Sequence, residues 1–149
     1  MEKQMIEEMK SFVKNKETCV LATATNNNPH CSLMAYVTDD DCREIYMVTS
    51  RRTKKFHNLS ENPSVSLLID TREEDYGSQN PKSRSLTIAG VYSQLADENK
   101  KSKIRSEMAS KHPTIRDLIK NPNSEILCIK IVSFLLLNGP TEAHFEILK

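Results

Sequence analysis

The sequence predicts a mainly β protein, an antiparallel barrel of six or seven strands with flanking helices. Short runs that alternate apolar and polar side chains recur along the chain and are separated by turn residues. The connections between most runs are too short for the crossover helices of a parallel sheet. Gly90 interrupts a strand-like run, as barrel corners require. Because the chain has 149 residues, we expect residues 1–149 to form one domain with its own core.

The first third of the chain predicts a helix followed by an antiparallel meander. Apolar residues at helical spacing from Met5 to Val13 indicate an amphipathic helix that ends near Asn15. Three strands then follow, because β-branched and small residues dominate these runs. Two turns rich in Asn, Pro and Asp separate them. The strands are expected at residues 18–25, 30–38 and 44–49.

The remaining elements are read in the same way. A short helix containing Phe56 and Leu59 ends before Pro63. Asp97 is a candidate N-cap for a helix that buries Ile104 and Met108. A further short helix begins at Pro113. Four more strands are expected at residues 64–70, 85–95, 125–137 and 143–148. The polar segment 71–83 is expected to be a long loop, either mobile or functional.

Composition excludes several function classes. A net charge of +1 gives no overall field for nucleic acid or a membrane surface. No apolar run is long enough to span a membrane, and the charged N-terminus lacks a signal-peptide core, so we expect a cytoplasmic protein. Three glycines provide no nucleotide-binding Gly-rich loop. The cysteines and histidines lack the spacing of metal ligands, so no metal is expected and the thiols are expected to be reduced. The cysteines are Cys19, Cys31, Cys42 and Cys128.

The segment TSRRTKK, residues 49–55, has an unfavourable charge for its predicted position. It joins a strand to a helix, so its four cations crowd the helix N-terminus, where the macrodipole favours acidic residues. A bound anion would reverse this unfavourable interaction, because helix N–H groups, hydroxyls and cations all bind phosphate. By contrast, the basic run 100–105 follows acidic residues and is interpreted as a solvated helix face. A catalytic pair of Cys31 with a distant histidine remains a minor alternative.

The order of these parts resembles the pyridoxamine 5'-phosphate oxidase-like family of FMN-binding split barrels. The matching text runs from TCVLATATNNNPHCSLMAYV through IYMVTSRRTKKFHNLSENPSVSLLID and resumes at SRSLTIAGVYSQL. The resemblance implies a Greek-key split barrel that forms a homodimer, with FMN in a groove at the subunit interface. The sequence itself predicts no nucleic-acid partner, because it has no DNA-binding motif and few aromatic residues, and no membrane association, because its apolar runs are short.

The resemblance also implies roles for particular residues. Thr53, Lys54 and Lys55 would bind the FMN phosphate, with help from Ser50 or Arg51. Val48 and Thr49 would contribute backbone contacts to the ring. The main-chain groups of one strand would line the isoalloxazine, namely those of Ser32, Leu33, Met34 and Ala35. Ser85 stands where the oxidases usually have a glutamine near the flavin. No catalytic residue is implied.

Two departures from the family pattern shape the functional hypothesis. The chain has no tryptophan and lacks the C-terminal Trp and Arg pattern that helps the true oxidases hold pyridoxal phosphate. Ser32 replaces an arginine of those enzymes. We therefore expect an FMN-dependent oxidoreductase with a different, unknown small-molecule substrate. One alternative is a non-catalytic module that binds or senses a flavin, haem or deazaflavin. Another is a barrel that has lost its cofactor and functions only as a dimer.

Overall fold

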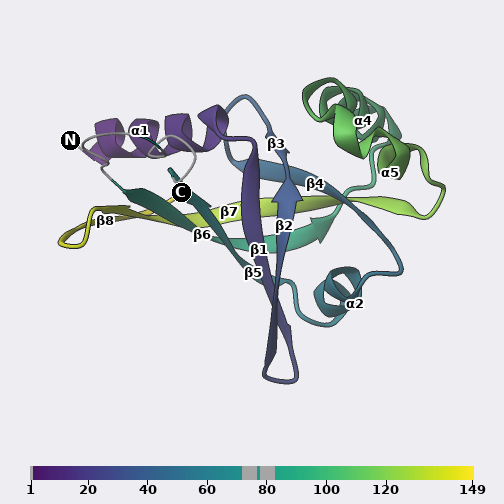
Figure 1. Ribbon diagram of the computed structural model, residues 1–149, viewed down its shortest axis with the longest axis horizontal. Helices are drawn as coiled ribbons and strands as arrows, with labels where there is room; N and C mark the ends of the chain where they lie inside the picture. Colours follow the sequence, from purple (N-terminus) through teal and green to yellow (C-terminus); the bar gives the residue numbers. More distant parts are fainter. Residues whose placement is uncertain (1, 72–76, 78–82) are drawn as a thin grey trace.

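A computed structural model describes residues 2–71, 77 and 83–149, and its centre is one curled antiparallel sheet (Figure 1). The strand order is β2-β1-β5-β6-β7-β4-β3, and β8 pairs with β7 beside this path. The predicted mainly β antiparallel class is confirmed. The strands are β1 Thr18–Thr25, β2 Asn28–Ala35, β3 Val37–Thr38, β4 Glu44–Ser50, β5 Ser64–Asp70, β6 Arg84–Gln94, β7 Ser124–Asn138 and β8 Glu142–Ile147.

The helices cover the ends and one outer face of this sheet. They are α1 Glu2–Asn15, α2 Lys54–Glu61, α4 Glu98–Lys111, the short 3₁₀ helix η1 Pro113–Ile115 and α5 Arg116–Lys120. Figure 1 shows α1 on the opposite side of the molecule from α4 and α5. The apolar face of α1 joins the main core, whereas Ile104 and Met108 of α4 pack on the outer side of β4 and β7. Because these apolar residues face the core, they recur at helical spacing in the sequence.

The two ends of the strand path are joined by a single residue, Tyr36. β2 pairs with β1, and β3 pairs with β4, so the sheet curls until its two edges approach each other. Tyr36 is fully buried. Its backbone N–H donates to Glu17 O at 3.2 Å, and its hydroxyl donates to Val13 O at 2.5 Å. The strand predicted at 30–38 is therefore divided at Tyr36, which gives the sheet eight strands instead of seven.

Gly90 lies at an irregularity of the β6–β7 ladder, as the sequence predicted. The register shifts between Ala89 and Gly90. A Cβ atom at Gly90 would lie 2.6 Å from Ile129 Cγ2 and 3.1 Å from Lys130 O. The close approach of β7 thus requires a residue without a side chain at this point.

The other predicted elements lie within about two residues of their expected bounds, the usual uncertainty at element ends. The predicted loop 71–83 falls mostly outside the described residues. Among the described helices, none has the length and apolar character that a membrane-spanning helix needs.

Candidate functional site

The predicted transition from strand to helix at TSRRTKK is present. β4 ends at Ser50, and Thr53 is the N-cap of α2, since its Oγ1 accepts a hydrogen bond from Phe56 N at 3.3 Å. The first turn of α2 contains no acidic residue. Within the described structure, the N–H groups of Lys54 and Lys55 have no hydrogen-bond acceptor. The start of α2 therefore presents two free donors and an uncompensated dipole.

The hydroxyl groups of Thr53 and Ser50 differ in whether their protons already take part in hydrogen bonds. Thr53 Oγ1 donates to Ser50 O at 2.9 Å and lies 3.1 Å from Thr49 Oγ1. The single proton of Thr53 is thus used within the turn, and its main role in the free protein is to shape that turn. Ser50 Oγ accepts from Arg52 N at 3.2 Å. Its own proton is directed to no acceptor in the described part of the chain, so Ser50 is available as a donor.

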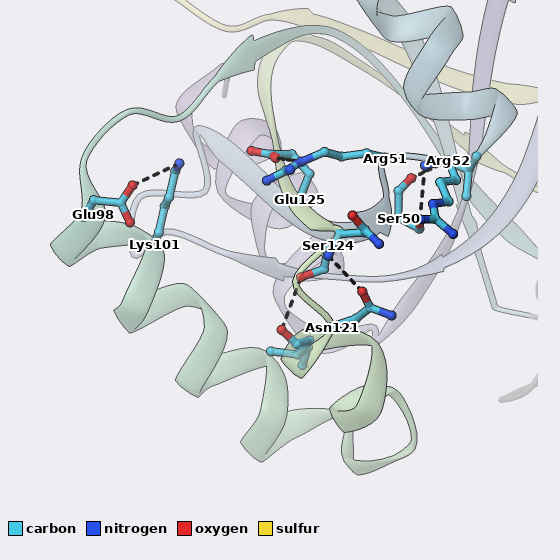
Figure 2. Close-up of polar contacts among 11 residues, drawn as sticks. Ser50, Arg51, Arg52, Glu98, Lys101, Asn121, Ser124 and Glu125 are labelled. Carbon is cyan, nitrogen blue, oxygen red and sulfur yellow. Dashed lines mark hydrogen bonds and ion pairs between the residues drawn. The ribbon is translucent and has the colours of Figure 1, made fainter.

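The four cations of this segment differ in their exposure and in whether they have a counter-ion. Arg51 Nε lies 2.8 Å from Glu125 Oε2, so a carboxylate already compensates its charge (Figure 2). Arg52 and Lys54 are exposed. Lys55 is partly buried, and this burial lowers the pKa of its ammonium group. No acidic side chain among the described residues lies within ion-pair distance of Lys55. Of the four cations, Lys55 is the desolvated one without a counter-ion.

The residues predicted to line the ring lie on the two sides of a split in the barrel. In the β3–β4 ladder, Val37 lies opposite Tyr46. Continuing that register would bring Ala35 opposite Val48 and Leu33 opposite Ser50. However, β2 pairs only with β1 in the described structure, so the edges of β2 and β4 that face each other make no ladder. Their main-chain donors and acceptors are left for another partner.

The predicted residues on β2 have distinct environments. Met34 is buried in the core, Leu33 is 73% exposed, and Ala35 is intermediate. Ser32 Oγ is buried and has no hydrogen-bond partner among the described residues. Such an orphaned polar atom is costly unless water or a ligand satisfies it. Ser32 shares its face of β2 with the buried Met34, so this unsatisfied hydroxyl lies on the inner face of the strand beside the split.

Ser85 is not brought together with the other predicted residues within one subunit. It pairs with Leu137, whereas Ser50 pairs with Ser124, and these partners lie near opposite ends of the fifteen-residue strand β7. Ser85 instead lines a cavity of about 380 Å³, together with Asp70 and Arg84. A contact of Ser85 with a ligand at Ser50 would require a second subunit.

Sequence reasoning missed a polar network beneath the start of α4. The Glu44 carboxylate accepts hydrogen bonds from Tyr46 Oη at 2.8 Å, Lys100 Nζ at 3.0 Å and Cys128 Sγ at 3.2 Å. Burial would raise the pKa of Glu44, but these hydrogen bonds outweigh it and hold the pKa below its ordinary value. Lys100 is thus ion-paired, which corrects the interpretation of its basic run as merely solvated. Glu44 and Tyr46, two hydrogen-bonding side chains on the same face of one strand, were the available signal.

An apolar row crosses the outer face of the sheet. Ladder partners connect one residue from each of six strands, and three of these residues are markedly exposed: Leu33, Leu68 and Phe145 at 73%, 38% and 59%. The row consists of Leu33, Val20, Leu68, Thr87, Leu135 and Phe145. It contains no charged residue. Large exposed apolar side chains such as those of Leu33 and Phe145 are often found in protein–protein interfaces.

Comparisons with known proteins agree with this geometry. A family model described as pyridoxamine 5'-phosphate oxidase matches residues 5–138. A putative pyridoxamine 5'-phosphate oxidase from Listeria innocua superposes with a TM-score of 0.71 and 21% identity, over 91% of this chain and 99% of that one. An FAD-binding protein from Mesorhizobium loti gives a TM-score of 0.70 and 19% identity, over 87% and 91%.

A haem-binding protein from Mycobacterium smegmatis has the same fold. Its TM-score is 0.80 at 17% identity, and the match covers 95% of this chain. The chain spans only 57% of the length of that protein. No curated protein matches in sequence. Structures with this fold are therefore named for both flavin and haem ligands.

Proposed function

Because residues 5–138 match its family model, the chain belongs to the pyridoxamine 5'-phosphate oxidase family, and we propose that it is a homodimeric FMN-binding oxidoreductase. The observation that carries the proposal is the start of α2. Lys55 has a partly buried ammonium with no ion-pair partner among the described residues, and the N–H groups of Lys54 and Lys55 are free in a turn without acidic residues. A phosphate dianion supplies the missing charge and the missing acceptors.

The phosphate is held by Lys54, Lys55 and the hydroxyl of Ser50, while Thr53 keeps the turn in shape through its cap. Arg51 stays on Glu125 and contributes only to the surrounding field. This proposal refines the expectation from the resemblance, in which Thr53 bound phosphate directly and Arg51 could assist.

The ring lies in the split between β2 and β4. The main-chain groups of Leu33, Ala35 and Val48 point away from β1 and β7 and offer donors and acceptors at its two sides. Those of Ser32, Met34 and Thr49 are used in the ladders with β1 and β7. FMN supplies hydride and electron transfer there, and the protein supplies binding, orientation and exclusion of water. The substrate is a small molecule, and the donor set gives no reason to assign pyridoxamine phosphate.

The dimer is built on the apolar row of the outer face. A two-fold arrangement buries Leu33, Leu68 and Phe145, and it allows Ser85 of the partner subunit to approach a flavin bound at Ser50. Residues 1–149 act as one domain in each subunit. A cytoplasmic location is proposed because all four cysteines are free thiols, as in reducing compartments.

The second candidate is a binding or sensing module for haem. The observation that favours it is the structural match to the haem-binding protein from Mycobacterium smegmatis. Lys55 alone does not separate the two ligands, because the propionates of haem are also anions; the free N–H groups of Lys54 and Lys55 and the Ser50 hydroxyl favour a phosphate dianion.

Flavin-free protein titrated with FMN, and separately with haem, distinguishes these functions. We expect the fluorescence of FMN to fall when it binds the protein. The melting temperature of the protein should rise. Addition of a nicotinamide donor, then an electron acceptor, should reduce and reoxidise the bound flavin. Binding of FMN without turnover would indicate a non-catalytic flavin-binding protein. Binding of haem but not of FMN would contradict the proposed flavin site.

A further inference from the structure

A buried histidine at the end of α4 holds the main chain where β2 ends and β3 begins. His112 Nε2 lies 2.9 Å from Tyr36 O. A carbonyl oxygen can only accept a hydrogen bond, so Nε2 carries a proton and donates it. His112 is 7% exposed, and its backbone N–H donates to Met108 O as the C-cap of α4. The donor is therefore buried and is held in place by its own helix.

Two hydrogen bonds orient the peptide groups on either side of Tyr36. The Tyr36 N–H donates to Glu17 O at 3.2 Å, and it belongs to the same peptide group as the carbonyl of Ala35. The Tyr36 carbonyl, which accepts from His112, belongs to the same peptide group as the N–H of Val37. Because each peptide group is planar, the two bonds set the directions of Ala35 O and of Val37 N–H.

The carbonyl of Ala35 is one of the groups proposed to face the flavin ring. In the β1–β2 ladder the main chain of Ala35 points away from β1 and into the split, whereas that of Tyr36 points back towards Glu17. The side chain of Tyr36 is fixed too, since its hydroxyl donates to Val13 O at 2.5 Å. The last residue of the strand beside the ring is thus followed by an anchored residue, and α4 supplies one of the anchors.

A separate contact ties the other end of α4 to the sheet. Lys100 Nζ lies 3.0 Å from Glu44 Oε1 on β4. Neither Lys100 nor Glu44 contacts Tyr36 in the described structure. The two ends of the helix can therefore be loosened one at a time, which separates a general loss of α4 packing from the loss of the contact at Tyr36.

We infer that His112 is a positioning residue of the flavin site, which acts through Tyr36 O to set the direction of the Ala35 main chain beside the ring. The inference rests on the proposed flavin site, because it assigns His112 a role towards a ring bound there. It adds α4 to the elements that shape the site, since the residues assigned to the flavin so far lie on β2, β4, β6 and the start of α2.

His112→Gln and His112→Asn form a matched pair of variants. Both replace the imidazole by a neutral amide, and they differ by one methylene group. The Gln amide nitrogen reaches the position of Nε2 and keeps the donor, whereas the Asn amide is too short. Lys100→Met is the control for a loosened α4, because it removes the contact with Glu44 and leaves Tyr36 O with its donor.

Riboflavin and FMN are titrated into each variant, and the absorption of bound FMN is recorded at saturation. His112→Asn should weaken both ligands by the same factor, about twofold to tenfold, as for the loss of one neutral hydrogen bond. The visible bands of its bound FMN should shift, which a loss of stability alone would not cause once the site is saturated. His112→Gln and Lys100→Met should match the wild type in both measurements. If His112→Asn does not fold, His112→Met takes its place.

Hydrogen exchange of the flavin-free protein tests the contact without any ligand. The amides of Tyr36 and Val37 should exchange faster in His112→Asn than in His112→Gln. Equal exchange, or wild-type affinity and band positions in His112→Asn, would overturn the inference and leave the flavin proposal intact. The same changes in Lys100→Met would also overturn it. If the wild type binds neither FMN nor riboflavin, the flavin proposal falls and the inference falls with it.

Discussion

Replacing Lys55 by methionine separates the affinity for phosphate from the stability of the free protein. Methionine keeps the length and apolar stem of the side chain and removes its charge. In the proposed flavin complex, the Lys55 ammonium would make a charge-assisted hydrogen bond to the phosphate, and such bonds contribute about 1.5–3 kcal/mol. FMN should therefore bind roughly tenfold to 150-fold more weakly to Lys55→Met.

The free protein should respond in the opposite direction. Burial lowers the pKa of Lys55, so its charged form is less favourable in the folded state than in the unfolded state. Removing that charge should leave the melting temperature of flavin-free protein unchanged or raised. A mutation that merely damaged the fold would lower both the melting temperature and the affinity.

Fluorescence titration with FMN and with riboflavin provides the assay, and Lys103→Met is the matched control. Lys103 is an exposed lysine of α4, far along the chain from the proposed site. Riboflavin lacks the phosphate, so its affinity should be the same for Lys55→Met and the wild type. The reasoning is refuted if Lys55→Met weakens FMN no more than Lys103→Met, or weakens riboflavin equally.

Three further predictions concern the fold and the assembly. Thr53→Ala should lower the free energy of unfolding by about 1 kcal/mol in urea titrations, because Phe56 N loses its cap, and Thr53→Ser should restore most of it. The pKa of Glu44 is lowered, so its contribution to stability is present above the ordinary glutamate pKa and is lost as the pH falls through the lowered value. Glu44→Gln should therefore make the free energy of unfolding less dependent on pH in the acid range. Leu33→Asp should shift sedimentation from dimer to monomer and leave the far-ultraviolet circular dichroism unchanged, and a dimer that persists would contradict the assigned interface.

Most of the sheet was predictable because its strands carry their own signals. The alternation in 64–70 and the turn residues after Thr25 specify local structure without reference to distant contacts. The division of a strand at Tyr36 was not predictable. It arises from hydrogen bonds to Glu17 and His112, which lie in other elements, and the local sequence reads as continuous strand.

The candidate site was predictable in part for the same reason. The unusual charge of TSRRTKK is a local feature, so the hypothesis of an anion site could be formed from the sequence alone. Which cation lacks a counter-ion depends on tertiary contacts. Arg51 forms an ion pair with Glu125 because β4 and β7 are neighbouring strands. The position of Ser85 on β6, opposite Leu137 near the far end of β7, likewise follows from topology, and a contact with the proposed flavin requires a dimer.

The most direct test of the flavin proposal is an absorbance spectrum of the protein as isolated, followed by mass spectrometry of the released ligand. The account predicts the two visible bands of an oxidised flavin and a released molecule with the mass of FMN. A haem spectrum, or a colourless protein whose melting temperature does not change with added FMN, would contradict it.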